Sequence, residues 1–368
     1  MKKIALLGGT HFIGYHLLRN LFSRGYQITI FNRGITQPPT PLSEEVEVVI
    51  GNRNNPKDFQ KLFCKKFDVV FDLSGYNESH ILPIVRDYQS NIGHYIFCST
   101  SSVYKTSSSG LLDEESPRDF TRNTYGGDKA CTEELLLSEC KAKKWPVTIF
   151  RPSGVFGPYD FGTPTHQAWQ VFYRLINSLP IPVINEIKSS FSLLYVDDLV
   201  NGFIQAMNSE NSHGKIYGIA GDEVSTELDF IKICGEICSQ EPEIHLVENL
   251  GYERVKFLHP WPKHDLVIDS TKVKTDLALN FTSLKTALSI TYSWFTLHPE
   301  HFDRPSFRGQ RYVLARRPIP EFVRIGWKFV DRATFILHLN KQFFRIGKTS
   351  LLVFWRFIKK WLRQRIAL

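Results

Sequence analysis

The chain has 368 residues, of which 42% are hydrophobic and 22% are charged. These values are ordinary for a packed globular protein and exclude a disordered or fibrous chain. The length suggests two domains rather than one. The longest apolar run near the C-terminus, Leu351 to Trp355, is far shorter than the roughly 20 residues that cross a bilayer. The N-terminal apolar run is cut by Gly8 and Gly9, so we interpret it as a buried strand rather than a signal peptide.

The formal net charge of +8 is divided unevenly along the chain. Residues 310–368 contain 14 Lys and Arg against two acidic residues, which leaves residues 1–309 with a net charge of −4. We therefore expect an anionic partner to bind the C-terminal segment rather than the whole protein. The six cysteines include no Cys-x-x-Cys pair, and Cys234 and Cys238 have no His or Cys partner at a metal-binding spacing. This favours buried thiols, no metal site and a cytoplasmic location.

The first half of the chain alternates short apolar runs with longer helix-like stretches. The runs of strand length, rich in β-branched and aromatic residues, are 4–7, 27–31, 46–50, 69–73, 95–98 and 147–150. The stretches between them that are long enough for helices are 12–24, 56–64, 81–89 and 129–143. This alternation predicts an α/β fold, a doubly wound parallel sheet with helices on both faces. After Phe156 the pattern loosens, which indicates a smaller lobe interleaved with the sheet.

A glycine-containing segment follows the first expected strand. It reads Gly8-Gly9-Thr10-His11-Phe12-Ile13-Gly14 and opens a helix. Glycines at this place let the backbone approach a pyrophosphate, and the helix N-terminus supplies N–H groups and the positive end of its dipole. The position between a strand and a helix predicts a dinucleotide-binding loop, with a tight turn that binds no ligand as the alternative.

This loop resembles that of the extended and atypical short-chain dehydrogenase/reductase superfamily, the NAD(P)-dependent epimerase/dehydratase family. The family pattern is Gly-x-x-Gly-x-x-Gly, and His11 stands here at the middle glycine, as a large and often basic residue does in atypical members. The resemblance implies a Rossmann-like fold. It also implies cofactor contacts from the loop residues Gly8, Thr10, His11, Phe12, Ile13 and Gly14. His11 either lies over a phosphate or is simply a buried or exposed side chain.

The residues after the second expected strand bear on the choice of cofactor. An acid at this place would bond the ribose 2′-hydroxyl and select NAD, but the chain has Asn32 and Arg33. Arg33 can pair with a 2′-phosphate, which favours NADP over NAD unless Arg33 only decorates a turn. The resemblance adds Asn52 and Arg53 near the adenine. It also places Leu73, Ser74 and Gly75 along the pyrophosphate.

Tyr125 and Lys129 are four residues apart and therefore share one face of a helix. A phenol is a poor base at neutral pH because its pKa is near 10, and a nearby ammonium stabilises the phenolate and lowers that value. Such a tyrosine can exchange a proton with a carbinol oxygen while hydride moves to or from a nicotinamide. The alternative is a chance pair on a solvated helix.

The segment 97–104 resembles the family's Ser-Ser-x-x-Val-Tyr, which precedes its Tyr-x-x-x-Lys. Thr100 falls where the family has the catalytic Ser or Thr, with Ser101 as the nearest substitute, and Ser101 and Ser102 are implied to contact substrate. A serine-rich loop without function is the alternative. In the resemblance, Tyr125 is the acid/base and Thr100 polarises the substrate oxygen. Lys129 lowers the tyrosine pKa and binds the nicotinamide ribose.

A third segment, 151–158, resembles the family's Arg-x-x-Asn-Val-Tyr-Gly-Pro and implies substrate contacts from Pro152, Ser153 and Gly154. Gly154 replaces the Asn that contacts the substrate diphosphate in sugar-nucleotide members. A nucleotide-sugar substrate is therefore in doubt. Residues 195–199 resemble the family's His-Val-Asp-Asp, a structural turn.

The segment 310–368 has no counterpart in the family pattern. Its basic residues Arg356, Lys359, Lys360 and Arg363 fall on one helix face and its aromatic and aliphatic residues on another. A basic amphipathic helix of this kind lies at an anionic membrane surface, packs on the protein's own body or on a second subunit, or contacts nucleic acid.

These patterns predict an NAD(P)-binding domain at 1–155 with a returning segment near 193–220, a substrate lobe at 156–309 and a basic amphipathic extension at 310–368. The expected function is that of an oxidoreductase or epimerase acting on a secondary alcohol or ketone of a sugar-like or lipid-linked substrate. The alternative is a (ribo)nucleic-acid-binding protein without redox turnover, as some atypical members with a similar loop are. A homodimer, and a location in the cytoplasm or at the inner face of a membrane, complete the expectation.

Overall fold

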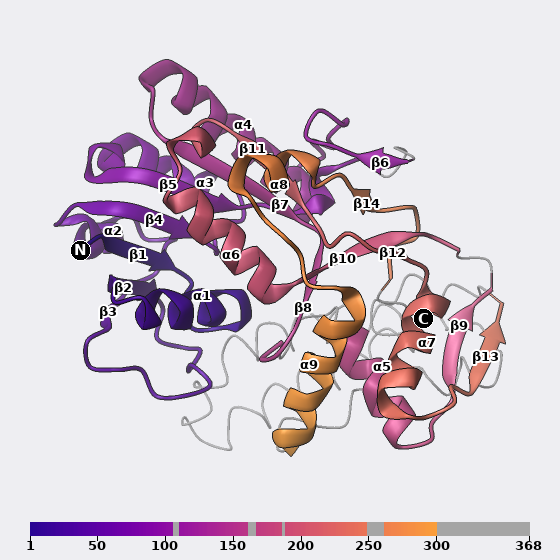
Figure 1. Ribbon diagram of the computed structural model, residues 1–368. Coiled ribbons are helices and arrows are strands. Elements are labelled where there is room, and N and C mark those ends of the chain that lie inside the picture. The colour runs from indigo at the N-terminus through magenta and orange to yellow at the C-terminus, as the bar shows by residue number, and fades with distance from the viewer. Residues whose placement is uncertain (106–109, 161–166, 186–187, 249–260, 300–368) are drawn as a thin grey trace, which may run out of the picture.

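The computed structural model describes residues 1–105, 110–160, 167–185, 188–248 and 261–299 (Figure 1). The main layer is a seven-stranded sheet of order β11-β7-β5-β4-β1-β2-β3. Each neighbouring pair in it is parallel. Its strands are β1 (Lys3–Leu7), β2 (Gln27–Asn32), β3 (Glu47–Ile50), β4 (Phe67–Asp72), β5 (Ile92–Cys98), β7 (Val147–Pro152) and β11 (Ile216–Ile219). The strand order reverses at β1, and such a reversal is where open α/β sheets bind ligands, beyond the carboxyl ends of the strands.

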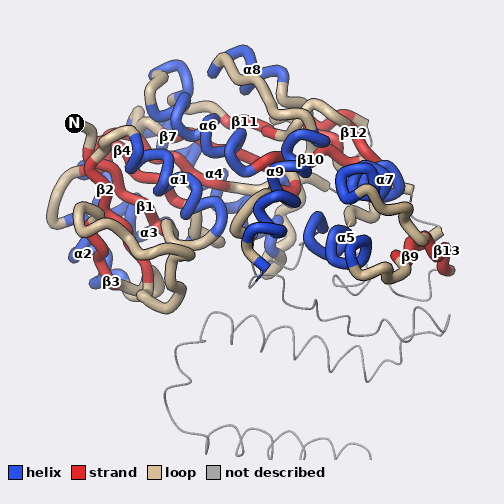
Figure 2. Tube along the Cα trace, turned by 60° about the horizontal axis from the view of Figure 1, so that its bottom comes forward, coloured by secondary structure: helices blue, strands red, loops and turns tan. Residues whose placement is uncertain are grey.

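Helices cover both faces of this sheet, as predicted from the strand–helix alternation (Figures 1 and 2). One face carries α1 (Phe12–Ser23), α6 (Val196–Met207) and α8 (Thr271–Leu277), and the other carries α2 (Pro56–Phe63), α3 (Glu78–Pro83) and α4 (Tyr125–Lys143). Successive residues of a strand point to opposite faces. Ile4 and Leu6 accordingly pack in one core, and Ala5 and Leu7 in the other.

A smaller lobe lies on the side of the molecule away from β1, β2 and β3 (Figure 1). It contains α5 (Gln167–Ile176), α7 (Glu227–Cys238), α9 (Leu284–Leu297) and the paired strands β9 (Ile181–Ile184) and β13 (Ile244–Val247). A small sheet formed by β8 (Gly154–Phe156), β10 (Phe191–Tyr195) and β12 (Val224–Ser225) joins it to the main layer, and β6 (Leu111–Leu112) pairs with β14 (Val267–Ile268). The chain leaves the main sheet after β7 and returns to it through α6 and β11.

Two helices differ from their predicted limits. The helix predicted at 129–143 begins at Tyr125, because the Thr124 hydroxyl accepts a hydrogen bond from the Gly127 N–H and caps the first turn. The helix predicted at 81–89 begins at Glu78, and a π-helical turn follows Pro83, which lacks the N–H that a regular helix uses.

Other predicted features concern membrane spans, metal ligands, cysteines and the C-terminal extension. Within those ranges, no helix is long and apolar enough to cross a membrane, and no group of His, Cys, Asp and Glu side chains is arranged to hold a metal ion. All six cysteines are free, and Cys98, Cys131 and Cys234 are buried. The predicted basic extension at 310–368 lies outside the described residues.

Candidate functional site

The phosphate loop connects β1 to α1 and depends on two glycines. Gly8 has a φ of +105°, a conformation that side chains disfavour. A Cβ on Gly14 would lie 2.0 Å from the carbonyl oxygen of Gly8, so only glycine fits. The exposed His11 precedes the helix, and its side chain accepts no capping hydrogen bond from the first turn. The N-cap residue therefore supplies no side-chain acceptor to the first turn of α1, and a helix N-terminus of this kind can bind an anion.

The end of β2 presents hydrogen-bond donors. The Asn32 side-chain oxygen already accepts a 2.7 Å hydrogen bond from the Gly34 N–H, which leaves the Asn32 amide nitrogen to face a ligand. Arg33 is exposed beside it. Burial raises the pKa of Tyr76, and the positive charges of Arg53 and Arg33 act against that increase. This end of the strand thus carries no carboxylate to accept from a ribose hydroxyl.

Arg53 has a structural partner. Its guanidinium donates to both Asp72 oxygens at 2.8 and 2.7 Å and to the Ser74 hydroxyl at 2.7 Å. Burial acts to raise the pKa of Asp72, but Arg53 and the Tyr95 hydroxyl outweigh it and lower that pKa to about 2. The same carboxylate accepts from the N–H groups of Ser74 and Gly75, so the ion pair holds the loop that follows β4. Asn52 is exposed and hydrogen-bonds within its own turn.

Tyr125, Lys129 and Thr100 come together at the carboxyl end of β5. Tyr125 is the first residue of α4, and the Thr100 hydroxyl lies close enough to its phenol to act against an increase in the Tyr125 pKa. Lys129, one turn later, is 2% exposed and donates to the Cys98 carbonyl at 2.6 Å. The Thr100 hydroxyl also accepts from the Ser102 N–H at 3.1 Å, which fixes its direction. The three side chains chosen from sequence motifs therefore share one site.

The electrostatics of this site differ from one expectation. Although 53% of the Tyr125 side chain is exposed, burial around its hydroxyl raises the pKa of the phenol, and the nearby Cys98 and Tyr76 add to the increase. The expected lowering of the Tyr125 pKa by Lys129 is therefore not found. Burial also lowers the pKa of Lys129 to about 8, against the opposing effects of Cys98 and Asp72. Its ammonium donates to the Cys98 carbonyl and not to a carboxylate. Because its pKa is only about one unit above neutral pH, Lys129 is protonated there by a narrow margin.

Sequence reasoning missed Tyr76, which directly follows the predicted cofactor residue Gly75. Its ring centroid lies 5.5 Å from the Lys129 ammonium and 6.1 Å from the Tyr125 ring, and 47% of the side chain is exposed. Phe97 lies against the same ammonium from within the core, at 4.5 Å. Tyr76 thus covers Lys129 at the surface of the site. No local signal marks it, since only the fold brings the loop after β4 beside α4.

The predicted substrate residues occupy two neighbouring segments. Ser101, which is buried, and Ser102, which is exposed, begin the 3-10 turn after Thr100. Pro152 is the last residue of β7, and Gly154 begins β8. Ser153 between them is 5% exposed, and its hydroxyl has no hydrogen-bond partner among the described residues. A buried hydroxyl of this kind at the carboxyl edge of the sheet is available to a ligand.

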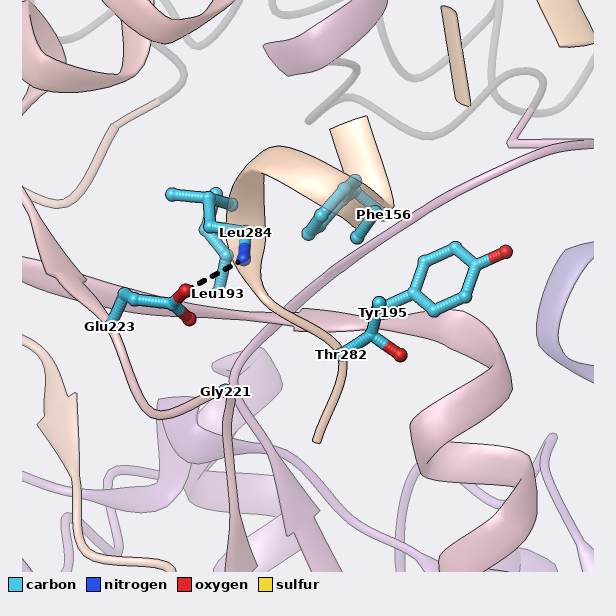
Figure 3. A pocket seen from close by; sticks show the side chains of 8 residues that line it. Phe156, Leu193, Tyr195, Gly221, Glu223, Thr282 and Leu284 are labelled. Atoms are coloured by element: carbon cyan, nitrogen blue, oxygen red, sulfur yellow. Dashed lines mark hydrogen bonds between the residues drawn. The ribbon is translucent and has the colours of Figure 1, made fainter. Parts of the chain in front are cut away.

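A cavity between the lobes lies apart from these residues (Figure 3). Its lining comes from β8, β10, the loop after β11 and the start of α9, and comprises Phe156, Leu193, Tyr195, Gly221, Glu223, Thr282, Leu284 and Ala287. Glu223 closes one side by accepting from the Leu284 N–H at 3.0 Å. The volume is about 10 Å³, room for a single water molecule. We interpret it as a packing gap at the joint between the lobes.

Comparison with known proteins identifies a family and relatives of this chain. The pattern of the NAD dependent epimerase/dehydratase family matches residues 4–220. The chain is 33% identical over 257 residues to the chloroplast stem-loop binding protein of 41 kDa b of Arabidopsis thaliana, a match that covers 66% of this chain and 65% of that protein. The chain thus spans less than two thirds of that relative.

Two solved structures show the same fold. The dTDP-glucose 4,6-dehydratase of Bacillus anthracis, in complex with NAD, superposes with a TM-score of 0.70 at 17% identity, over 82% of this chain and 98% of the other. The UDP-glucuronic acid 4-epimerase of Bacillus cereus, also in complex with NAD, gives a TM-score of 0.65 at 22% identity, over 80% and 99%. At these identities the similarity extends to the fold alone.

Proposed function

The chain belongs to the NAD dependent epimerase/dehydratase family, and from that premise we propose that it transfers hydride between a bound NAD(P) and a secondary alcohol or ketone of a sugar-like or lipid-linked substrate. The observation that carries the proposal is the meeting of Thr100, Tyr125 and Lys129 at the carboxyl end of β5. A phenol, a hydroxyl and an ammonium so placed suit proton transfer to an oxygen that hydride transfer turns into an alkoxide.

The residues at the carboxyl edge fit a dinucleotide. The loop around Gly8 and Gly14 forms a cradle that a Cβ would fill, and the Ser153 hydroxyl is buried without a partner among the described residues. When bound, NAD(P) supplies the group that accepts and returns hydride. The loop at residues 8–14 would hold its pyrophosphate, and Lys129 would hold the nicotinamide ribose.

Each of the three central residues has a distinct role in this proposal. Because burial keeps the Tyr125 phenol protonated at neutral pH, Tyr125 is prepared to donate a proton, which the reduction of a ketone requires. Thr100 lies beside the Tyr125 phenol and would bond the same substrate oxygen. Lys129 would hold the nicotinamide ribose one helical turn from Tyr125.

Turnover tests this assignment. A panel of secondary alcohols and ketones, sugar-like and lipid-linked, is incubated with NAD(P)⁺ or NAD(P)H, and cofactor absorbance is followed. Tyr125→Phe should abolish turnover and retain dinucleotide binding, whereas Tyr26→Phe, a matched change on a tyrosine outside the site, should leave both intact. Full turnover by Tyr125→Phe would refute the proposal.

We extend the proposal to the cofactor, and favour NADP over NAD. The support is at the end of β2, where the Asn32 oxygen is already engaged and the remaining groups, the Asn32 amide nitrogen and Arg33, are donors. Donors suit a 2′-phosphate, and a charge-assisted Arg–phosphate pair contributes about 1.5–3 kcal/mol. Wild-type protein should bind NADPH at least about tenfold more tightly than NADH, and Arg33→Ser should remove most of that difference. Equal affinities in wild-type protein would reverse the assignment.

The substrate class rests on Gly154. This residue replaces the Asn that contacts a substrate diphosphate in sugar-nucleotide members, and it brings no side chain to do so. A sugar-like or lipid-linked carbonyl compound without a nucleoside diphosphate therefore fits the proposal best. Turnover of UDP- or dTDP-sugars at rates above those of the other compounds in the panel would contradict it.

A second candidate function is the binding of a nucleic-acid stem-loop. It is favoured by the name of the relative that is 33% identical, and by the basic composition of residues 310–368. The net charge of −4 on residues 1–309 means that the basic segment would supply the phosphate contacts. Salt-sensitive retention of stem-loop RNA by the full chain, lost on removal of 310–368 and accompanied by no turnover, would support it. Retention by anionic vesicles instead would assign the segment to a membrane surface, and a change in mass on removal would assign it to a second subunit.

A further inference from the structure

A buried carboxylate on α4 connects the segments that hold the candidate site. Glu133 and Arg151 are both fully buried, and the Arg151 guanidinium donates to Glu133 at 3.1 Å through Nε and at 2.7 Å through Nη2. The Ser99 hydroxyl donates to Glu133 Oε1 at 2.5 Å, an oxygen that also accepts from Arg151 Nε. Arg118 adds a further contact at 3.2 Å. Both oxygens of one carboxylate are thus occupied by side chains from three other segments.

The partners of Glu133 are neighbours of the candidate catalytic residues. Glu133 lies one helical turn after Lys129 and two after Tyr125, on the same face of α4. Ser99 immediately precedes Thr100 at the end of β5. A rigid chain of hydrogen bonds therefore runs from the helix that carries the phenol and the ammonium to the segment that carries the hydroxyl.

Arg151 extends this chain toward the predicted substrate residues. It directly precedes Pro152 at the end of β7, and it also donates to the Glu114 carbonyl at 2.9 Å and to the Tyr104 hydroxyl at 3.4 Å. Tyr104 follows the 3-10 turn that begins at Ser101. The network thus joins both ends of the hydroxyl segment 99–104 to α4 and β7.

Stability alone does not account for a buried ion pair at this position. Removing two charges from water is costly, and well-packed apolar residues of similar size are often as stabilising. What apolar residues cannot supply is directional bonding between separate segments. The network therefore points to a requirement for fixed geometry at the carboxyl end of β5.

We propose that Glu133 is a positioning residue, which holds Thr100 in place relative to Tyr125 and Lys129 through Ser99 and Arg151. This inference rests on the proposed function for the roles of the three residues that it positions.

Glu133 also affects the charge of Lys129, and the other charges around Lys129 determine how large this effect is. Cys98, Asp72 and Glu133 favour the ammonium form, Arg53 opposes it, and His80 lies close enough for Lys129 to lower the His80 pKa. Among the groups that favour the ammonium, Glu133 contributes least, so its removal should lower the Lys129 pKa by a fraction of a unit.

The first arm of the test measures Lys129 directly. The side-chain nitrogen of Lys129 is titrated by NMR in full-length protein labelled with ¹⁵N-lysine, with Lys129→Met used to assign the signal. Glu133→Gln should lower the Lys129 pKa. Glu134→Gln is the matched control, since it removes the same charge from the next residue of α4, which points outward to Arg118, and it should leave the Lys129 pKa unchanged. Equal changes of the Lys129 pKa in the two variants would overturn the inference that the Glu133 charge favours the ammonium form of Lys129.

The second arm keeps the ion pair and breaks the connection to Thr100. Ser99→Ala removes one hydrogen bond and leaves Glu133 and Arg151 paired, so the variant should fold. It should reduce kcat about tenfold by misaligning Thr100, with KM within about twofold of wild type. Ser99→Thr, which restores the hydroxyl, should recover kcat. An unchanged kcat in Ser99→Ala would show that the network serves stability only and would overturn the positioning role.

Failure of the proposed function can be distinguished from failure of this inference. If Tyr125→Phe retains turnover, the proposed function is wrong. The Lys129 titration and its Glu134→Gln control need no substrate and therefore test the inference separately. If Glu133→Gln does not fold, Glu133→Asp, which keeps the charge on a shorter side chain, is compared with wild type in both arms. An unchanged kcat in that variant contradicts the requirement for fixed geometry.

Discussion

The two ends of strand β5 both contain buried polar side chains, but the two clusters differ in charge. At the amino end, the buried His94 bonds the Thr148 hydroxyl at 2.8 Å and lies with its ring 4.5 Å from the His213 ring. At the carboxyl end, Ser99 leads into the Glu133–Arg151 pair, and Lys129 donates to the Cys98 carbonyl.

The difference lies in the partners. Burial lowers the pKa of His94 to about 3, with His213 adding to the decrease, so that end is neutral near pH 7. Burial also acts to lower the pKa of Arg151, but the adjacent Glu133 carboxylate outweighs it and raises that pKa. Burial alone therefore leaves His94 neutral, whereas the fixed Glu133 carboxylate keeps Arg151 charged at the end of β5 where the candidate site lies.

The largest expected effect comes from removing one partner of the Glu133–Arg151 ion pair at the carboxyl end of β5. Arg151→Met leaves Glu133 buried without its main counter-charge, which should lower the free energy of unfolding by about 3–5 kcal/mol. Urea denaturation near pH 7 measures it. The double variant Glu133→Leu, Arg151→Met should recover a large part of the loss, because no unpaired charge remains. A loss under about 1 kcal/mol in the single variant would mean that the two ends of β5 do not differ as described.

The next largest effect is a loss of stability in acid, caused by protonation of His94 at the amino end of β5. His94 has a folded-state pKa of about 3 against 6.5 when exposed, so below pH 6.5 the unfolded chain binds a proton that the folded protein excludes. The free energy of unfolding should fall as the pH decreases from 6.5, by at most about 1.4 kcal/mol per unit. His80, whose pKa burial lowers to about 4, acts in the same direction.

Variants of these histidines separate their contributions. The free energy of unfolding is measured at pH 7 and at about pH 4.5. Both values lie above the pH range in which Asp72 titrates, because its folded pKa is about 2 and its contribution to stability is lost only below about pH 4. His94→Phe should have a smaller pH dependence than wild type, and His80→Phe should remove a separate and smaller part. The same slope in His94→Phe as in wild type would assign the acid sensitivity elsewhere.

The smallest expected effect concerns the cover over Lys129. Tyr76→Ala removes the ring 5.5 Å from the ammonium and should cost about 0.5–1 kcal/mol of stability, the size of an exposed cation–π contact. The Lys129 pKa should rise, because burial lowers it and the smaller side chain admits water. Tyr76→Phe keeps the ring and serves as the control. A Lys129 pKa that stays near 8 in Tyr76→Ala would show that the burial comes from Phe97 and the strands instead.

Six of the seven strands of the main sheet could be predicted from sequence, because each contains a short apolar run, whereas β11 (Ile216–Ile219) was not identified as a strand. The joining sheet was harder. Its strands β8, β10 and β12 are short, and they pair residues far apart in the chain, such as Phe191 with Ser225. Nothing in a local window distinguishes such a strand from a loop.

The residues of the candidate site could be predicted from sequence where their function requires a fixed spacing along the chain. Tyr125 and Lys129 share a helix face by spacing, and Thr100 was placed by the order of the motifs. Glu133 was not identified. Its spacing of four residues from Lys129 places it on the same helix face, but its partners Ser99 and Arg151 come from other segments that only the fold brings beside it. The pKa of Tyr125 was expected in the wrong direction for a similar reason, since burial depends on segments that only the fold brings together.

A crystal structure of the chain with bound NADPH tests the central claim most directly. We expect the pyrophosphate on the loop at residues 8–14, the 2′-phosphate against Arg33, and the nicotinamide ribose within hydrogen-bonding distance of Tyr125 and Lys129. A dinucleotide that binds elsewhere, or a nicotinamide ring far from the Tyr125 hydroxyl and Thr100, would contradict the account.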